Sequence, residues 1–119
     1  MAKISVVDDS QATIDMLVSI LESSQHTVTA FSDSVAVEQK IAAEQPDIIL
    51  LDVVMPERNG YEVLRALKRS QDTKDIPVIL VSSKNEMTDI RWGLRQGAAG
   101  YVAKPFTEQA LLGAIAEQV

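Results

Sequence analysis

A chain of 119 residues with 46% apolar and 24% charged residues fits one folded domain, residues 1–119, and excludes a disordered protein. The absence of cysteine excludes disulfides and thiolate chemistry, and a single histidine, His26, argues against a Ser-His-Asp triad or a multi-histidine zinc site. The net charge of −6 offers no attraction to nucleic acid, and no apolar run approaches the roughly 18–20 residues of a membrane span. We therefore expect a cytoplasmic protein that binds neither nucleic acid nor membranes.

Apolar segments typical of strands alternate with amphipathic helical patterns along the chain. In chain order, the sequence predicts a strand over Ile4–Val7, a helix with apolar Ile14, Leu17, Val18 and Leu21, a strand over Thr27–Phe31 and a helix over Ser34–Glu44. There follow a strand over Ile48–Leu51, a helix opened by Gly60 with apolar Val63, Leu64 and Leu67, and a strand over Val78–Val81. The last elements are a helix over Glu86–Gln96, a short strand at Tyr101–Val102 and a helix capped by Thr107, with Leu111, Leu112, Ile115 and Val119 on one face.

Strict alternation of strands and helices requires a parallel sheet with helices on both faces. The continuous apolar runs IILL and VILV agree, because a strand that is covered on both faces cannot alternate apolar with polar residues. We therefore predict a doubly wound α/β fold with a five-stranded parallel sheet and five helices.

Polar side chains stand at the C-terminal ends of four predicted strands, and ligands bind beyond this edge of an open parallel sheet. They are Asp8 with Asp9, then Asp52, Ser82 and Lys104. Helix capping is an alternative role for Ser82, but it explains the three carboxylates poorly. Two carboxylates about 4 Å apart repel by about 4 kcal/mol at an effective dielectric near 20. Such a cluster takes up protons or holds a cation, and hard carboxylate oxygens suit Mg²⁺.

These residues and their spacing resemble the receiver domain of two-component response regulators, the CheY-like family. The matching features are the Asp8–Asp9 pair, Asp52 in LLDVVMPERNG, Ser82 in VSS and Lys104 in YVAKPF. The resemblance covers essentially the whole chain. It implies the flavodoxin-like strand order 2-1-3-4-5.

The resemblance also implies a role for each acid. Asp52 is the expected phosphoacceptor, and a sensor histidine kinase is the expected donor. Mg²⁺ is expected on Asp9 and Asp52, with Asp8 nearby or bound through water, and with the backbone carbonyl of Val54 as a further ligand. An aspartate can attack phosphorus and form an acyl phosphate, which makes this role chemically reasonable.

The resemblance implies further that Ser82 and Lys104 bind the phosphoryl group and that the peptide bond before Pro105 is cis. Tyr101 occupies the position of an aromatic residue that fills the space opened when Ser82 moves toward the phosphate. The alternative is that Tyr101 only fills the edge of the sheet.

The predicted helix Glu86–Gln96 carries Met87, Ile90 and Leu94 on a stripe that we expect to face inward. Trp92 points nearly opposite to this stripe, so we expect it to be exposed as a contact for a partner. The alternative is that its indole lies over neighbouring side chains.

Arg91 and Arg95 add positive charge to the same helix. We expect a downstream motility or signalling protein to bind the face made by this helix, the strand at Tyr101–Val102 and the last helix. The string KNEMTDIRWGLRQGA resembles a narrower group, the PilH-like regulators of type IV pilus twitching motility and phototaxis. This resemblance implies a role in chemotaxis-type control of pilus motility. We expect a monomeric single-domain regulator and not an enzyme.

Val54 and Lys84, two residues after Asp52 and Ser82 respectively, flank the approach of water to a phosphoryl group on Asp52. Val54 cannot hydrogen-bond a water molecule and Lys84 can occupy the entrance, so we expect slow self-dephosphorylation.

Three other functions compete with this interpretation. A hydrolase of the haloacid dehalogenase type needs a second aspartate two residues after its nucleophile, where this chain has Val54. A flavin or nucleotide carrier needs a glycine-rich loop after the first strand, where this chain has DDSQAT. A receiver that serves only as a scaffold is disfavoured by the complete set of acids together with Ser82 and Lys104.

Overall fold

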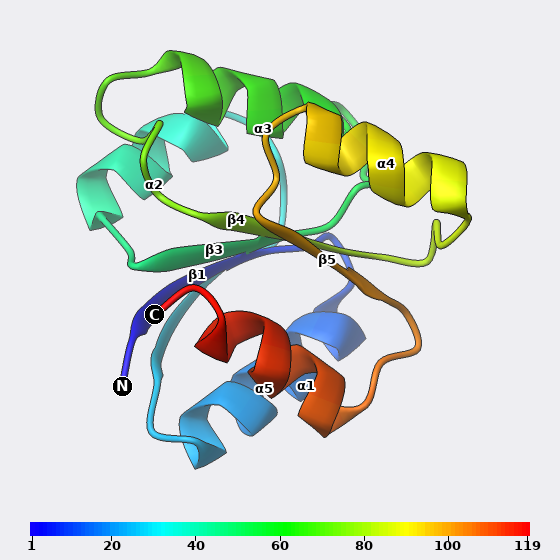
Figure 1. Ribbon diagram of the computed structural model, residues 1–119. Helices are drawn as coiled ribbons and strands as arrows, with labels where there is room; N and C mark the ends of the chain where they lie inside the picture. The colour runs from blue at the N-terminus through cyan, green and yellow to red at the C-terminus, as the bar shows by residue number, and fades with distance from the viewer.

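A five-stranded parallel sheet lies between two layers of helices in the computed structural model, which describes residues 1–119 (Figure 1). The strands are β1 (Lys3–Val7), β2 (Thr27–Phe31), β3 (Ile48–Leu51), β4 (Val78–Ser82) and β5 (Gly100–Ala103). The helices are α1 (Gln11–Ser23), α2 (Val37–Glu44), α3 (Gly60–Arg69), α4 (Met87–Arg95) and α5 (Glu108–Ala116). The strand order is β2-β1-β3-β4-β5, which confirms the predicted fold class.

Each face of the sheet has its own apolar core. Helices α1 and α5 cover one face, and α2, α3 and α4 cover the other (Figure 1). Ile4 and Val6 of β1 enter the first core, whereas Val7 enters the second. Every residue of β3 and β4 is buried, as the continuous apolar runs of these strands predicted. None of the five helices has the length and apolar character that a membrane crossing requires.

Side-chain caps begin α1, α3 and α5 next to the edge of the sheet where the strands end. The Ser10 side chain accepts a hydrogen bond from the Thr13 N–H at the start of α1. Thr107 caps α5 as predicted, because its hydroxyl accepts the Ala110 N–H at 3.0 Å. These caps fix where the loops after β1 and β5 end.

Helix α2 starts at Val37, later than the predicted Ser34. Ser34 is fully buried in the preceding loop, where its hydroxyl donates to the Pro56 carbonyl and accepts the Arg58 N–H, each at 3.2 Å. Tertiary hydrogen bonds therefore hold Ser34 outside the helix.

The predicted inward stripe of α4 is wrong for two of its three residues, since only Ile90 is half-buried. Met87 and Leu94 are 61% and 45% exposed, and the one buried residue of the helix is Gly93. A Cβ at Gly93 would lie 2.6 Å from Cδ1 of Leu80, so the backbone of α4 itself packs on the sheet at this point. The missing side chain lets this face approach the strands, and Met87 and Leu94 are turned outward.

The predicted apolar face of the last helix is correct only in part. Leu111 and Ile115 are buried and Leu112 is half-buried, but Val119 is 65% exposed. Helix α5 ends at Ala116, so Val119 lies beyond the helical periodicity from which its position was inferred.

Ser5 of β1 is fully buried and its hydroxyl has no hydrogen-bond partner. We expect Ser5→Ala to raise the free energy of unfolding by about 1 kcal/mol, because alanine removes an unsatisfied polar group from the core. Ser34→Ala is the matched control and should be destabilising, since this buried hydroxyl has two partners. Urea unfolding measures both, and a loss of stability in Ser5→Ala equal to that in Ser34→Ala would contradict the expectation.

Candidate functional site

The polar residues that end the strands converge at one edge of the sheet. Asp8 follows β1, Asp52 follows β3 and Lys104 follows β5, while Ser82 is the last residue of β4. Parallel pairing brings them to one level, since Val7 lies opposite Leu51 and Ser82 opposite Ala103. This convergence is the one that the sequence predicted.

The carboxylates of Asp8, Asp9 and Asp52 form one cluster. One oxygen from each lies within 4.8 Å of the others. Asp8 and Asp52 are 1% and 6% exposed, whereas Asp9 is exposed. Two of the three negative charges are therefore shielded from water, and repulsion between them is stronger than it would be at the surface.

Lys104 is the cation that lies in the cluster. Its Nζ donates to Oδ2 of Asp8 at 2.9 Å and lies 3.6 Å from Oδ1 of Asp52. The other oxygen of Asp8 accepts the Ser10 N–H at 2.9 Å, so Asp8 is held at both oxygens. Oδ1 of Asp52 accepts the Val53 N–H at 2.8 Å, which leaves Oδ2 of Asp52 without a hydrogen bond.

Burial raises the pKa of Asp52 to about 6, and the nearby charge of Asp8 acts in the same direction. The Lys104 ammonium and the Val53 N–H lower this pKa but do not cancel the effect of burial. Asp52 therefore ionises at neutral pH at a cost to the folded state, and an additional cation would stabilise its charged form.

The donor set fits Mg²⁺. It consists of hard carboxylate oxygens, and the exposure of Asp9 leaves one side of the cluster open to water, which Mg²⁺ usually retains in part. Val54 lies in the loop after β3 with its side chain 52% exposed. Its predicted role as a carbonyl ligand remains a prediction.

Gly60, which the sequence predicted only as the start of a helix, also lies against the site. A Cβ at this position would lie 2.1 Å from the carbonyl oxygen of Asp52, so any side chain would displace the backbone that carries the acid. The Gly60 N–H also donates to the Val53 carbonyl at 2.7 Å. A glycine that opens a helix soon after a strand-terminal acid is a usable signal for this packing.

Ser82 is fully buried, and its Oγ accepts the Lys84 N–H at 3.1 Å. The N-cap of α4 is Glu86, so the alternative that Ser82 caps this helix is wrong. Lys84 itself is exposed. The Lys104–Pro105 peptide bond is cis, as predicted.

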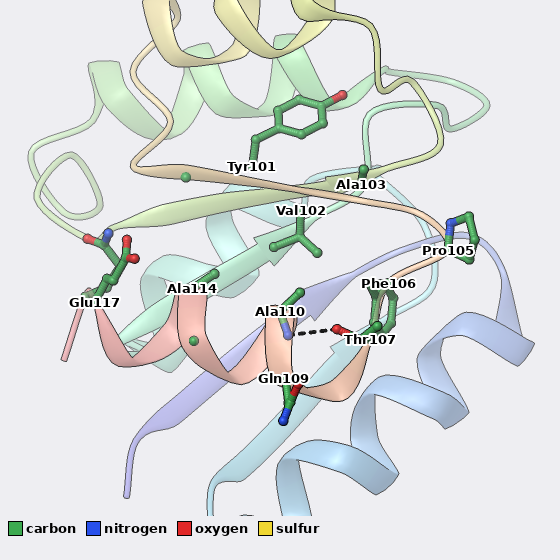
Figure 2. Close-up of a pocket in the computed structure, with 13 residues that line it drawn as sticks. Tyr101, Val102, Ala103, Pro105, Phe106, Thr107, Gln109, Ala110, Ala114 and Glu117 are labelled. Carbon is green, nitrogen blue, oxygen red and sulfur yellow. Dashed lines mark hydrogen bonds between the residues drawn. The ribbon is translucent and has the colours of Figure 1, made fainter.

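Tyr101 points from β5 away from α5, toward the layer that contains α4 (Figure 2). Its hydroxyl donates to the carbonyl of Lys84, in the loop between β4 and α4. Burial raises the pKa of Tyr101 to about 12, so the phenol stays protonated and able to donate this hydrogen bond at neutral pH.

The exposed surface of α4 carries the three residues predicted for a partner face. Arg91 and Arg95 are exposed, and Trp92 is 47% exposed. The Trp92 ring also meets the ring of Tyr61 edge-on, with centroids 6.4 Å apart and an interplanar angle of 86°. The indole therefore packs on a neighbour and still presents about half of its surface, and its role as a partner contact remains a prediction.

A pocket separate from the acidic cluster lies between β5 and α5 (Figure 2). Val102, Phe106, Ala110 and Ala114 supply apolar surface to it, and Glu117 supplies the one charged side chain. Since it contains none of the clustered acids, the pocket is a feature of the surface formed by β5 and α5 and not part of the acidic site.

Comparison with known proteins agrees with this geometry. The family model described as "Response regulator receiver domain" matches residues 4–116. Protein PilH of Pseudomonas aeruginosa is 42% identical over 118 residues, which cover 97% of this chain and 95% of PilH. Protein PilG of the same organism is 34% identical, with 98% of this chain and 87% of PilG covered.

Among solved structures, the chemotaxis protein CheY4 of Vibrio cholerae superposes with a TM-score of 0.92 at 27% identity and covers 100% of this chain and 99% of its own. The fold, the sequence match and the acidic cluster agree. The chain belongs to the receiver domain family of two-component response regulators.

Proposed function

We propose that this chain is a single-domain response regulator that accepts a phosphoryl group on Asp52 from a sensor histidine kinase. The observation that supports this most directly is the position of Asp52, buried, clustered with two other carboxylates and 3.6 Å from the Lys104 ammonium. Burial and repulsion make the ionised acid responsive to cations, and phosphoryl transfer depends mainly on positioning and on charge neutralisation.

In the proposed reaction, Oδ2 of Asp52 attacks the phosphorus of a phosphohistidine. The new O–P bond forms as the P–N bond breaks, and the imidazole leaves with the electron pair of that bond. This oxygen suits the role because it has no hydrogen bond to break first. Lys104 and the Ser82 hydroxyl stand at the ends of β5 and β4 to bind the phosphoryl oxygens.

Asp9 and Asp52 would hold Mg²⁺ directly, with Asp8 close by and the Val54 carbonyl as a further ligand. When bound, Mg²⁺ neutralises charge on the carboxylates and on the phosphoryl group. Receiver domains bind Mg²⁺ at an acidic pocket, and the three clustered carboxylates of this chain supply one.

The response is proposed to pass from Ser82 through Tyr101 to a partner-binding face. Movement of Ser82 toward the phosphoryl group would change its bond to the Lys84 N–H, in the same loop whose carbonyl Tyr101 contacts. This face comprises α4, β5 and α5, with Trp92, Arg91 and Arg95 as its exposed contacts. The arginines favour an acidic partner on an otherwise acidic protein.

The likeness to PilH over nearly the full length of both chains, together with the string TDIRWGLRQGA, supports a role in chemotaxis-type control of type IV pilus motility. We propose a cytoplasmic monomer whose output is protein contact. An Asp-based hydrolase remains disfavoured, since Val54 stands where such an enzyme needs its second acid.

Labelling with radioactive acetyl phosphate tests the acceptor. We expect wild-type protein to be labelled only with Mg²⁺ present and Asp52→Asn not to be labelled at all, since an amide cannot form the acyl phosphate. Asp72→Asn, at an exposed acid in the loop after α3, is the control and should be labelled normally. Equal labelling of Asp52→Asn and wild type would show that another residue is the acceptor.

The lifetime of the phosphorylated form tests the role of Val54 and Lys84. Both side chains are exposed beside the site, and we expect the double variant Val54→Asn, Lys84→Glu to lose its label several times faster, because polar and acidic groups can orient a water molecule. The decay of the radiolabel is followed in wild type, in the double variant and in Lys74→Glu, an exposed lysine after α3. If the double variant decays no faster than Lys74→Glu, water access at these two positions does not set the lifetime.

A further inference from the structure

Tyr61 is an aromatic side chain that the proposed phosphoryl chemistry does not use. It is the second residue of α3 and follows Gly60, whose position against the Asp52 carbonyl leaves no room for a Cβ. The Gly60 N–H is bonded to the Val53 carbonyl as well. The first turn of α3 is therefore fixed to the backbone that carries Asp52, and Tyr61 projects from that turn.

Tyr61 reaches from α3 to α4. Its hydroxyl donates to the carbonyl of Asp89 at 3.4 Å, and its ring meets Trp92 edge-on. Ile90 is the one large apolar side chain of α4 that is half-buried. Gly93 is the one buried residue of this helix, and Met87 and Leu94 are exposed. Tyr61 therefore adds a side-chain contact from α3 to a helix that rests on the sheet mainly through Gly93 and β5.

Tyr101 approaches α4 from the sheet. A Cβ at Gly93 would lie 3.3 Å from Cδ2 of Tyr101, so the phenol ring lies against the helix backbone. Tyr61 and Tyr101 pack against the same core cluster. Burial raises the pKa of both tyrosines, and each phenol also affects the pKa of the other, as expected of close neighbours. Helix α4 is thus held by one tyrosine from α3 and one from β5.

We propose that Tyr61 is a positioning residue for the switch, and that it holds α4 in the arrangement in which Tyr101 is bonded to the Lys84 carbonyl. The inference rests on the proposed function, since it takes Asp52 as the phosphoacceptor and Tyr101 as the switch residue. If the Tyr101 hydroxyl leaves the Lys84 carbonyl when Asp52 is phosphorylated, α4 loses one of the two tyrosine contacts that hold it. The movement that this allows would break the bond between the Tyr61 hydroxyl and the Asp89 carbonyl. A contact made only in the resting arrangement lowers the affinity for any ligand that favours the other arrangement.

Titration with beryllium trifluoride, a phosphoryl mimic, in the presence of Mg²⁺ tests the proposal. Calorimetry gives the affinity for wild type, Tyr61→Phe and Tyr61→Leu. We expect Tyr61→Phe to bind the mimic about 2- to 10-fold more tightly, the range that corresponds to one hydrogen bond. Tyr61→Leu should bind more tightly still, because it also loses the aromatic contact with Trp92.

Trp92 is the single tryptophan, and its quenching by acrylamide supplies a second readout. Binding of the mimic should change the quenching in wild type. In Tyr61→Phe without the mimic, quenching should already be shifted toward that bound value. Val28→Ala is the control for a general loss of stability, since Val28 is half-buried in β2, at the edge of the sheet opposite β5. The affinity of Val28→Ala for the mimic should equal that of wild type.

The outcomes separate the inference from the function on which it rests. Equal or weaker binding of the mimic by Tyr61→Phe, with normal binding by wild type, overturns the role of Tyr61 alone. Tighter binding by Val28→Ala to the same extent also overturns it, because the effect would then follow stability and not the contact with α4. Absence of Mg²⁺-dependent binding in wild type overturns the proposed function, and the role of Tyr61 with it.

Discussion

Repulsion among three carboxylates at the edge of the sheet is the constraint on which the rest of the site depends. Asp8 and Asp52 are almost fully buried, and the structure supplies a single ammonium, that of Lys104, between them. One positive charge does not balance three negative ones, so the metal-free protein keeps an unfavourable negative charge at this edge. That charge is what a divalent cation would neutralise, and it is why burial and repulsion together raise the pKa of Asp52.

The scaffold maintains this arrangement through close backbone packing on either side of the sheet edge. Gly60 lets α3 begin directly against Asp52, and Gly93 lets α4 lie on β4 and β5. Both approaches require the absence of a side chain, so the start of α3 is fixed against Asp52 and the middle of α4 against Leu80 and Tyr101. Tyr61 lies between these two close contacts, since it follows Gly60 in sequence and contacts α4 in space.

The sequence predicts much of the fold and the acidic cluster because both follow from local patterns. Apolar runs mark β3 and β4, and the acids that follow β1 and β3 meet because parallel strands end at the same edge. The orientation of α4 could not be predicted, because periodicity weights Met87 and Leu94 and gives no weight to Gly93. The contact of Tyr61 with α4 joins helices that are distant in sequence, so no local pattern contains it.

Thermal and urea unfolding of the chelator-treated protein from pH 4 to 7.5 tests the central claim most directly, with Asp52→Asn compared to wild type. The pKa of Asp52 is about 6 when folded, above its ordinary value of 3.8, so its contribution to stability is present below pH 3.8 and is lost as the pH rises through 6. The two proteins should therefore be about equally stable at pH 4. Asp52→Asn should be more stable by about 2–3 kcal/mol at pH 7.5, from about 1.4 kcal/mol per pKa unit, and Mg²⁺ should narrow this difference. A difference that does not change with pH, or a wild type that is the more stable protein at pH 7.5, would contradict the claim that the carboxylates are electrostatically strained.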